Sequence, residues 1–550
     1  MVENRIDGVG SSHRTGDGNG NPGCISPVEL SLFSNRVQSV CDEMGAALKR
    51  AAFSPNIKDR LDFSCALFDG NGQLTAQAAH IPVHLGSMAF AMESIVNTVQ
   101  WKPGDMVVVN DPYKGGTHLP DVTLIAPVYL QGIRVAFVAN RAHHANIGAS
   151  SPGSMPVSTH LQQEGIVIPP THIQRQGEVQ QSVLFRLAGL VEGEDSKSKD
   201  QANFTPPQQS ALGDFKAQMS ANRIGVERLL QLIQRYGVAQ FNKLVEGIND
   251  YAQSLALASL KTIPDGRYRY TDWLDDDGAG TRGVQISAEL TVAQGDIEVD
   301  FAGTAAQVKG NVNCPLSVAA AAIFYCLRCL MPEQMPVCAG AFRGIRLRAA
   351  KGSLLNAEYP AAVAAGNVET STRVVDVVLG ALAQAIPNLI PAASQGSMNN
   401  LAMGGIDGGG ESWDYYETMG GGMGASSKSQ GLSAVQTHMT NTLNTPVESL
   451  ESHYPIQLTR YQVRRGSGGQ GFHSGGDGII REFRFTQPAT VTLLTERRAR
   501  APWGAQGGKP GKTGNNFLNA QPLPAKISTT VAAGDVLCVE TPGGGGWGKE

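Results

Sequence analysis

The sequence has few charged side chains, and the two signs nearly cancel. Lys and Arg number 44 and Asp and Glu number 48 among 550 residues, which gives a formal net charge of −4. A protein that binds nucleic acid or an anionic membrane surface needs a surplus of positive charge to attract phosphate groups. The composition therefore predicts neither nucleic acid nor a membrane as a partner.

Cysteine is scarce and scattered. Eight cysteines are spread from Cys24 to Cys538, which is too dilute for a disulfide framework and predicts free thiols in a reducing, cytoplasmic location. Cys326 and Cys329 have the CxxC spacing of a metal-binding pair. They follow an apolar run, however, and buried free cysteines behave as small apolar residues, so a place in a packed helix is the favoured interpretation.

Long apolar runs are missing. The most apolar stretch, residues 316–330, contains Arg328 and is shorter than the ~20 residues that cross a bilayer, so it predicts a buried helix. Residues 1–24 lack the apolar region of a secretory signal and are predicted to be a disordered N-terminal lead.

Motifs of nucleotide binding and of nucleophilic catalysis are also missing. The sequence contains neither a GxxxxGK[ST] phosphate loop nor a GxSxG nucleophile elbow. Residues 466–471 match GxGxxG formally, but no helix is expected after them, as dinucleotide binding requires. Any nucleotide chemistry must therefore use another kind of site or another chain.

Glycine, in contrast, is abundant. It accounts for 65 of the 550 residues, and short β-rich runs alternate with turn signals. We predict an α+β, multi-domain protein with Gly-rich mixed and antiparallel sheets and a helical layer in the middle of the chain. The predicted parts are the disordered lead 1–24, an α+β domain 25–200 with a His and Asp loop cluster, a helical segment 201–265, and a Gly-rich α+β region 266–550.

Local patterns predict several elements directly. Ser26 is a predicted N-cap with Glu29 three residues later, which indicates a helix. Residues 69–72 (DGNG) and 131–132 (QG) each separate two β-rich runs and predict hairpin turns. A turn also accounts for the carboxylates of residues 275–277 better than an acid/base pair does.

Five of the eleven histidines fall within residues 80–144. They are His80, His84, His118, His143 and His144. The loop 111–121 adds two carboxylates next to them. A two-residue turn pairs Leu130 with Ile133, and in that register Asp121 lies opposite Ala142. Cross-strand neighbours are about 5 Å apart, so both adjacent histidines are expected beside the loop.

Imidazole and carboxylate groups around an open position suit a catalytic divalent metal that lowers the pKa of water. Alternatively, these side chains satisfy buried backbone groups in a Gly-rich loop. The candidate catalytic residues are Asp111, His118, Asp121, His143 and His144. His80 and His84 are further candidate metal ligands, although Pro82 between them prevents a regular helix that would place both on one face.

Several long motifs resemble the hydantoinase B/oxoprolinase family. They are 111–121 (DPYKGGTHLPD), 141–148 (RAHHANIG), 152–156 (PGSMP), 165–170 (GIVIPP), 366–371 (GNVETS), 416–425 (YETMGGGMGA) and 436–448 (QTHMTNTLNTPVE). The resemblance runs from about residue 25 to the end of the sequence.

The resemblance implies one subunit of a hetero-oligomeric, ATP-dependent enzyme. A hydantoinase A-type partner with an actin-like fold would bind ATP and Mg²⁺ and phosphorylate a carbonyl oxygen. This B-type chain would then complete the opening of a five-membered cyclic amide such as 5-oxoproline or hydantoin. Carboxylase relatives imply a divalent metal, Zn²⁺ or Mn²⁺, at positions that match His118, Asp121 and His143. Those relatives make a ketone carboxylase subunit one alternative, and a non-catalytic scaffold for the ATPase is another.

Two further groups of polar residues are candidate substrate contacts. Asp59, Arg60 and Asp62 lie beside the first hairpin, and Glu369, Thr370 and Ser371 stand at a predicted helix start. Amides at a helix N-terminus can hold a carboxylate or phosphate, but capping alone explains the second group equally well.

The sequence departs from the family pattern at two positions. Asn146 replaces a residue that is commonly acidic in the family, and His160 replaces one that is often glutamate. The asparagine removes one possible carboxylate ligand, and His160 could compensate for it.

Overall fold

The computed structural model describes residues 25–79, 81–189 and 205–550. The predicted lead at residues 1–24 and the candidate ligand His80 lie outside them. Helices alternate with several mainly antiparallel sheets, which confirms the α+β prediction. The division of the chain into separate domains at residues 200 and 265 stays a prediction.

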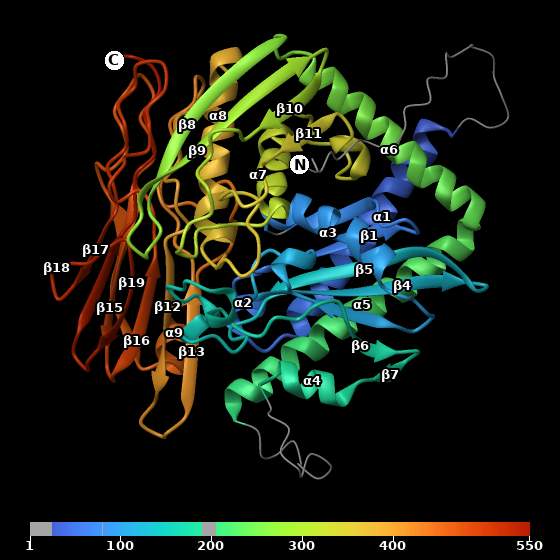
Figure 1. The fold of residues 1–550 in the computed structure, drawn as a ribbon, viewed down its shortest axis with the longest axis horizontal. Coiled ribbons are helices and arrows are strands. Elements are labelled where there is room, and N and C mark those ends of the chain that lie inside the picture. The colour runs from blue at the N-terminus through green and yellow to red at the C-terminus, as the bar shows by residue number, and fades with distance from the viewer. Residues whose placement is uncertain (1–24, 80, 190–204) are drawn as a thin grey trace.

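The first part of the chain forms a seven-stranded sheet that is buried on both faces. In spatial order its strands are β2 (Leu74–Ala79), β1 (Phe63–Asp69), β5 (Ile133–His143), β4 (Asp121–Leu130), β3 (Met106–Val109), β6 (Thr171–Arg175) and β7 (Glu178–Val179). Helices α1 (Pro27–Ala51) and α5 (Pro206–Tyr236) pack on one face, and α3 (His84–Thr98) packs on the other (Figure 1). Leu67 faces the first pair and its neighbour Phe68 faces α3, because successive side chains of a strand alternate.

Two of the local predictions are confirmed in detail. Helix α1 begins after Ser26, whose hydroxyl accepts a hydrogen bond of 3.1 Å from the N–H of Glu29. Between β1 and β2, Oδ1 of Asp69 accepts hydrogen bonds from the N–H groups of Asn71 and Gln73, both at 2.8 Å. The carboxylate therefore closes a turn.

The β4–β5 hairpin corrects the predicted register by one residue. Gln131 and Gly132 form the expected two-residue turn with φ of 51° and 79°, and Leu130 pairs with Ile133. A bulge then shifts the ladder between Val128 and Tyr129. Asp121 consequently lies opposite His143 and not opposite Ala142. One extra residue on β5 brings an imidazole directly across from the carboxylate.

The predicted helical segment contains two long helices. α5 is followed by α6 (Val238–Leu260), and Gly237 joins them at φ 75°. The short α4 (Gln181–Leu187) precedes them. Residues from the three predicted parts after the N-terminal lead, among them Leu48, Ile233 and Val375, share one hydrophobic cluster, so the helical segment is part of the main core.

A second sheet and two apolar helices follow. The sheet has the order β11 (Ile345–Arg348), β10 (Asp296–Asp300), β9 (Arg282–Ala293) and β8 (Gly266–Asp276). Helix α8 (Ser371–Ala385) packs on β8 and β9, and α7 (Leu316–Arg328) lies between α8 and α3. Cys326 is buried in α7, as predicted, and all seven cysteines of the described residues are free. Asp277 accepts three backbone N–H groups and forms a turn.

The last part of the chain forms two further sheets, at the left of Figure 1. One has the order β13 (Ser412–Glu417), β12 (Asn400–Ile406), β16 (Ala489–Leu494) and β19 (Lys526–Val531). The other has the order β14 (Ile456–Arg464), β15 (Gly478–Phe485), β20 (Val536–Glu540), β17 (Asn515–Leu518) and β18 (Gln521–Pro522). Apolar side chains of both sheets and of α9 (Val447–His453) form one cluster, so the sheets pack face to face.

Glycine-rich segments pack backbone to backbone beside these sheets. The N–H of Gly544 donates to the carbonyl of Gly476 at 2.9 Å, and the N–H of Gly469 donates to Gly544 at 2.8 Å. A Cβ on Gly544 would lie 2.1 Å from the carbonyl oxygen of Met423, so only glycine fits. The GxGxxG match at residues 466–471 belongs to this packing, and β15, not a helix, follows it.

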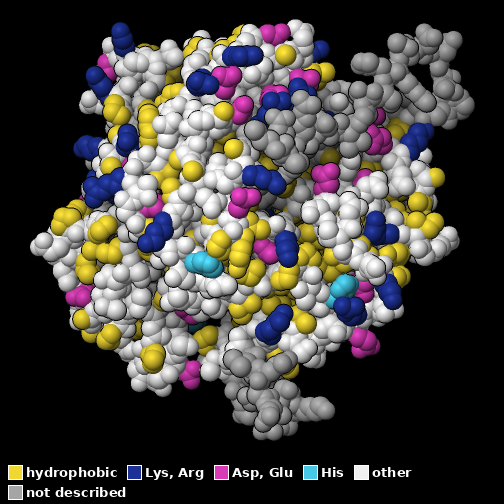
Figure 2. Space-filling view, viewed as in Figure 1, with side chains coloured by type: hydrophobic (Ala, Val, Ile, Leu, Met, Phe, Trp, Pro, Cys, Tyr) yellow, Lys and Arg dark blue, Asp and Glu magenta, His cyan; other side chains and the backbone are white. Residues whose placement is uncertain are grey.

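None of the helices in the described ranges combines the length and apolar character that crossing a bilayer requires. On the face drawn in Figure 2, basic and acidic side chains are interspersed and no patch of one sign dominates.

Candidate metal and active site

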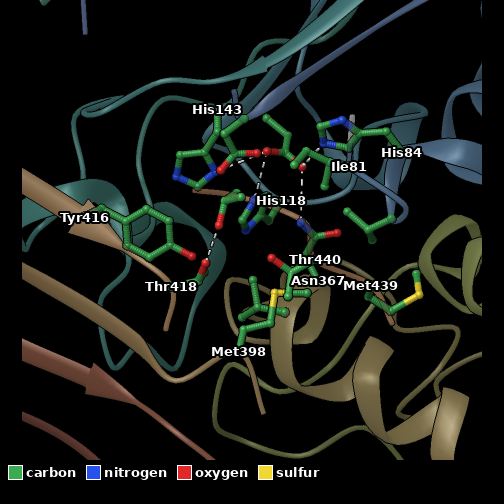
Figure 3. A pocket seen from close by; sticks show the side chains of 15 residues that line it. Ile81, His84, His118, His143, Asn367, Met398, Tyr416, Thr418, Met439 and Thr440 are labelled. Atoms are coloured by element: carbon green, nitrogen blue, oxygen red, sulfur yellow. Dashed lines mark hydrogen bonds and ion pairs between the residues drawn. The ribbon is translucent and has the colours of Figure 1, made fainter. Parts of the chain in front are cut away.

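A small, largely buried pocket lies where the N-terminal sheet meets the segments around α8 and β13. Its volume is about 20 Å³, enough for an ion or a water molecule. The lining residues are Asp62, Ile81, Val83, His84, His118, Asp121, His143, Asn367, Val368, Met398, Tyr416, Thr418, Met439, Thr440 and Thr442. Figure 3 shows the three histidines on one side and the residues beyond 360 on the other.

Asp121 is the centre of the polar side of the pocket. Its Oδ1 lies 3.2 Å from Nδ1 of His143 and 3.1 Å from Nε2 of His118. Its Oδ2 accepts hydrogen bonds from the hydroxyl of Thr117 at 2.8 Å and from Nδ2 of Asn367 at 3.1 Å. Asp121, the first residue of β4, thus contacts the last residue of β5, the loop before β4 and the turn before α8.

The three ionisable groups shift one another's pKa. Burial would raise the pKa of Asp121, but His118 and the other histidines outweigh it and hold the pKa well below its usual range. Burial would lower the pKa of His118, but the Asp121 carboxylate outweighs it and the pKa is raised. Burial prevails at His143, whose pKa is lowered. Asp121 is therefore ionised in the pocket, and its carboxylate can attract a cation.

The donor set of this group fits a divalent metal. Nδ1 of His118 lies 3.2 Å from the carbonyl oxygen of Ala364 and must donate to it. In the neutral ring, Nε2 then carries no proton and has a free lone pair. That Nε2 and Nε2 of His143 have no hydrogen-bond partner, although both rings are buried. The 3.1 Å between Nε2 of His118 and Asp121 is short but poorly aligned for a hydrogen bond.

A buried polar atom without a partner, such as Nε2 of His118, is costly, and a metal would satisfy it. One ligand atom from each of His118, Asp121 and His143 lies within 4.8 Å of the other two. An imidazole whose other nitrogen is held by a carbonyl is the usual arrangement of a metal ligand. The predicted candidate ligands are thus brought together in space.

His84 lies at the edge of this group. Its Nε2 is 3.4 Å from Oδ2 of Asp121, and its Nδ1 is 3.0 Å from the hydroxyl of Ser64. It lines the pocket but falls outside the three-residue set that could share one ion.

Two of the candidate catalytic residues lie elsewhere. His144 is bonded through Nε2 to Oε1 of Gln218 at 2.9 Å, and its ring packs on Phe215 of α5. Because neighbours on an extended segment point to opposite sides, His144 faces α5 while His143 faces the pocket. Asp111 caps the short 3₁₀ turn after β3 by accepting the N–H of Tyr113 at 3.0 Å. Neither residue lines the pocket.

The first group of candidate substrate contacts is only partly at the pocket. Asp62 lines it. Arg60 is buried behind it, donates to the backbone carbonyl of Tyr416 and lies 5.0 Å over that tyrosine ring. The ring of Tyr416 also stacks on His143 with centroids 4.8 Å apart. Asp59 stands at the end of the short helix α2 (Pro55–Lys58), outside the lining.

The second group is placed differently from the prediction. A π-helical turn (Gly366–Thr370) precedes α8, so the helix starts before Glu369. The N–H groups of Glu369 and Thr370 donate to the carbonyl of Ala365 and that of Ser371 to Gly366. These amides are therefore occupied. The Glu369 carboxylate accepts from Met398 and Asn400, and a substrate contact by this group stays a prediction.

The two departures from the family pattern both lie outside the pocket. Asn146 donates through Nδ2 to Oδ2 of Asp414 at 2.8 Å. His160 caps a 3₁₀ turn by accepting the N–H of Gln162. Asparagine at 146 therefore removes no carboxylate from the three-residue group.

Sequence reasoning missed the far side of the pocket. Asn367, Tyr416, Thr418, Met439, Thr440 and Thr442 line it. All six lie within motifs quoted for the family resemblance (366–371, 416–425 and 436–448). The family motifs thus contained these residues, but their side-chain types did not mark them individually as residues of a site.

The sequence is similar to several curated proteins. Arabidopsis thaliana 5-oxoprolinase 1 is 39% identical over 95% of this chain, and this chain spans only 42% of that relative's length. An uncharacterized protein of Methanocaldococcus jannaschii is 36% identical over 96% of this chain and 91% of its own length. A Pseudomonas protein provisionally named as the B-type subunit of a D-/L-hydantoinase is 30% identical over 96% of this chain and 90% of its own length.

The fold is similar to two solved structures. The ATP-dependent caprolactamase from Pseudomonas jessenii superposes with a TM-score of 0.86 at 25% identity, over 96% of this chain and 91% of that chain. A nucleotide-free acetone carboxylase shares the fold with a TM-score of 0.83 at 17% identity, over 95% and 76%. The model of the family described as hydantoinase B/oxoprolinase matches residues 26–550, and the chain therefore belongs to that family.

Proposed function

We propose that this chain is the B-type subunit of an ATP-dependent cyclic amidohydrolase that opens a five-membered lactam or imide ring. The observation that carries the proposal is the buried group of His118, Asp121 and His143, which lines a small pocket, brings one ligand atom of each residue within 4.8 Å of the others and leaves Nε2 of His118 without a hydrogen-bond partner. Relatives named as a 5-oxoprolinase and as a B-type hydantoinase subunit, and a similar structure named ATP-dependent caprolactamase, support the choice of a cyclic amide.

A partner of the hydantoinase A type would bind ATP with Mg²⁺ and phosphorylate the ring carbonyl. The absence of a phosphate loop from the sequence supports a separate nucleotide site. The greater length of the 5-oxoprolinase relative is compatible with an additional region that a separate subunit supplies in this system. The working enzyme is then a hetero-oligomer. The seven free cysteines of the described residues agree with a cytoplasmic location.

The residues of this chain would act on the phosphorylated imidate. Water adds its oxygen to the ring carbon, and Asp62, the pocket carboxylate outside the three-residue group, takes a proton and returns it to the ring nitrogen. The C–N bond then breaks as the new hydroxyl gives up its proton to the leaving nitrogen, which yields an acyl phosphate, and a second water hydrolyses this to carboxylate and phosphate. A Zn²⁺ or Mn²⁺ ion held by His118, Asp121 and His143 would lower the pKa of water at this place.

Substrate binding requires the pocket to widen. Its 20 Å³ is far below the roughly 300 Å³ or more of ordinary ligand pockets. Met398, Thr418, Met439 and Thr440 line the pocket, and we assign the binding of the ring to the side that these four residues form.

The test uses this chain purified together with an A-type partner. ATP consumption and ring-opened product are measured with 5-oxoproline, hydantoin and N-methylhydantoin. The proposal predicts turnover that requires both chains and one of these rings and that is independent of carbon dioxide. Turnover that requires a ketone and bicarbonate would replace the hydrolase by a carboxylase, and ring opening by the partner alone would reduce this chain to a scaffold.

A further inference from the structure

Glu164 is a fully buried acid that the proposed chemistry does not use. It follows a 3₁₀ turn (Leu161–Gln163) and has no exposed surface. Its Oε1 accepts three hydrogen bonds: from the hydroxyl of Ser158 at 2.6 Å and from the N–H groups of Val363 and Ala364, both at 2.9 Å. Oε2 accepts one, from Val363 at 3.1 Å. One oxygen therefore makes most of the contacts.

These hydrogen bonds reach the candidate metal group through one residue. Ala364, held by its N–H, presents its carbonyl oxygen to Nδ1 of His118 at 3.2 Å. Three residues later, Asn367 donates to Oδ2 of Asp121 at 3.1 Å. The segment 363–367 thus supplies an outer contact to two of the three candidate ligands, and the Glu164 carboxylate anchors the start of this segment.

The carbonyl of Ala364 decides which nitrogen of His118 is free. Because a carbonyl can only accept, the proton of the neutral ring stays on Nδ1, and Nε2 keeps its lone pair toward Asp121. If the carbonyl turned away, the ring could carry its proton on Nε2, and that nitrogen could not then bind a metal. Holding residue 364 in place therefore holds the carbonyl that fixes the tautomer of the ligand.

We propose that Glu164 is a positioning residue that holds the Ala364 carbonyl against His118 and so keeps Nε2 of that histidine available as a ligand. This inference rests on the proposed function, because it concerns the same candidate metal group. The requirement is for an acceptor atom at the place of Oε1 and not for a charge. Glutamine keeps a carbonyl oxygen at that place, whereas aspartate keeps the charge but is one methylene too short to reach it.

The two conservative variants therefore separate the two requirements. If an acceptor atom is needed, Glu164→Asp is the damaging change, and if charge is needed, Glu164→Gln is. Binding of Zn²⁺ to the full-length chain is measured by calorimetry, and Co²⁺ is used as a second probe because its absorption bands report the ligand geometry. Removal of an outer-shell contact typically weakens metal affinity about 10- to 100-fold. We expect Glu164→Asp to show such a loss and altered Co²⁺ bands, and Glu164→Gln to bind within about threefold of the unchanged chain.

His118→Ala separates the inference from the function on which it rests. If His118→Ala binds Zn²⁺ as well as the unchanged chain, the metal site itself is wrong. If His118→Ala loses binding but Glu164→Asp does not, only the positioning role is wrong. A loss in Glu164→Gln as large as in Glu164→Asp also contradicts the inference, because it would show a need for charge. Thermal unfolding of each variant without metal identifies any variant that fails to fold, and the remaining one of the pair still decides.

Discussion

Asp121 and His143 face each other across the β4–β5 ladder, and Oδ1 of the aspartate lies 3.2 Å from Nδ1 of the histidine. The pair exists because β5 carries one extra residue opposite Val128 and Tyr129. Without that bulge, Ala142 would occupy the place of the histidine. A single irregularity in the backbone thus assembles two of the three candidate ligands at the ends of two central strands of the sheet.

Loss of one ligand should abolish metal binding selectively. In His118→Ala the group keeps only Asp121 and His143, so we expect Zn²⁺ affinity measured by calorimetry to fall at least 100-fold. His160→Ala is the matched control, because His160 caps a surface turn outside the pocket. Equal affinities of the two variants would contradict the site.

Metal removal should lower both stability and activity. A ligand present at 100 times its dissociation constant stabilises the folded state by about 2.7 kcal/mol. We expect dialysis against a chelator to lower the midpoint of thermal unfolding and added Zn²⁺ or Mn²⁺ to restore it. In Asp121→Asn the midpoint should not respond to either treatment. A metal response that persists in this variant would place the ion elsewhere.

Tyr416 should separate packing from hydrogen bonding. Its ring contacts His143 and Arg60, and its hydroxyl donates to Oδ1 of Asn400 at 2.7 Å. Tyr416→Phe keeps the ring and should cost about 1 kcal/mol. Tyr416→Ala leaves a cavity beside the histidine and should cost about 3 to 5 kcal/mol and weaken Zn²⁺ binding. Denaturant unfolding measures the loss of stability in each variant. Equal losses would show that the packing of the ring does not stabilise the site.

The buried Glu164 should make stability depend on pH. Burial raises its pKa to about 7 from the ordinary 4.5. The unfolded carboxyl loses its proton near pH 4.5 and the folded one only near pH 7, so the folded state binds more protons between these values. Stability from this group is therefore present at low pH, falls as pH rises from 4.5 to 7, and then levels off.

The expected change over that range is on the order of 3 kcal/mol. Glu164→Gln does not titrate and should lack this part of the decline. Urea unfolding of both proteins without metal, at pH 5 and pH 7.5, measures the difference. Parallel pH profiles would show that Glu164 ionises normally in the folded chain.

The Gly-rich packing should tolerate no side chain. Gly544→Ala would place a Cβ 2.1 Å from a backbone oxygen, so we expect misfolding or a loss of several kcal/mol in thermal unfolding, as overpacking at backbone causes. Gly409→Ala is the control, because its Cβ would meet only the flexible Asp407 carboxylate at 3.3 Å on the surface. Similar stability of the two variants would contradict the account of this packing.

Local chemistry predicted much of the fold. Ser26 begins α1 as expected, and the turns after Asp69 and at Gln131 form the expected hairpins. The register of β5 could not be predicted, because a bulge depends on how both strands pack against the helices on the two faces of the sheet. The turn and the alternation of side chains set the register of a hairpin only as far as the first bulge.

The candidate site was predicted on one side only. His118, Asp121 and His143 come together because they belong to one hairpin and the loop before it. The opposite wall, which includes Asn367 and Tyr416, is brought there by the packing of α8 and β13 from far along the chain. The register of the hairpin predicted His144 beside the loop together with His143, but the alternation of side chains turns it toward α5. The family motifs contain these residues, but no local pattern in a single sequence shows that they pack against the hairpin.

The most direct test compares ring opening by the unchanged chain and by Asp121→Asn, each co-purified with an A-type partner. The measured quantity is ring-opened product per ATP consumed, with 5-oxoproline or hydantoin as substrate. We predict that the variant keeps its association with the partner but loses ring-opened product by about 100-fold or more, as expected for removal of a group in the catalytic centre. Full ring opening by Asp121→Asn would contradict the proposal that this pocket performs the chemistry.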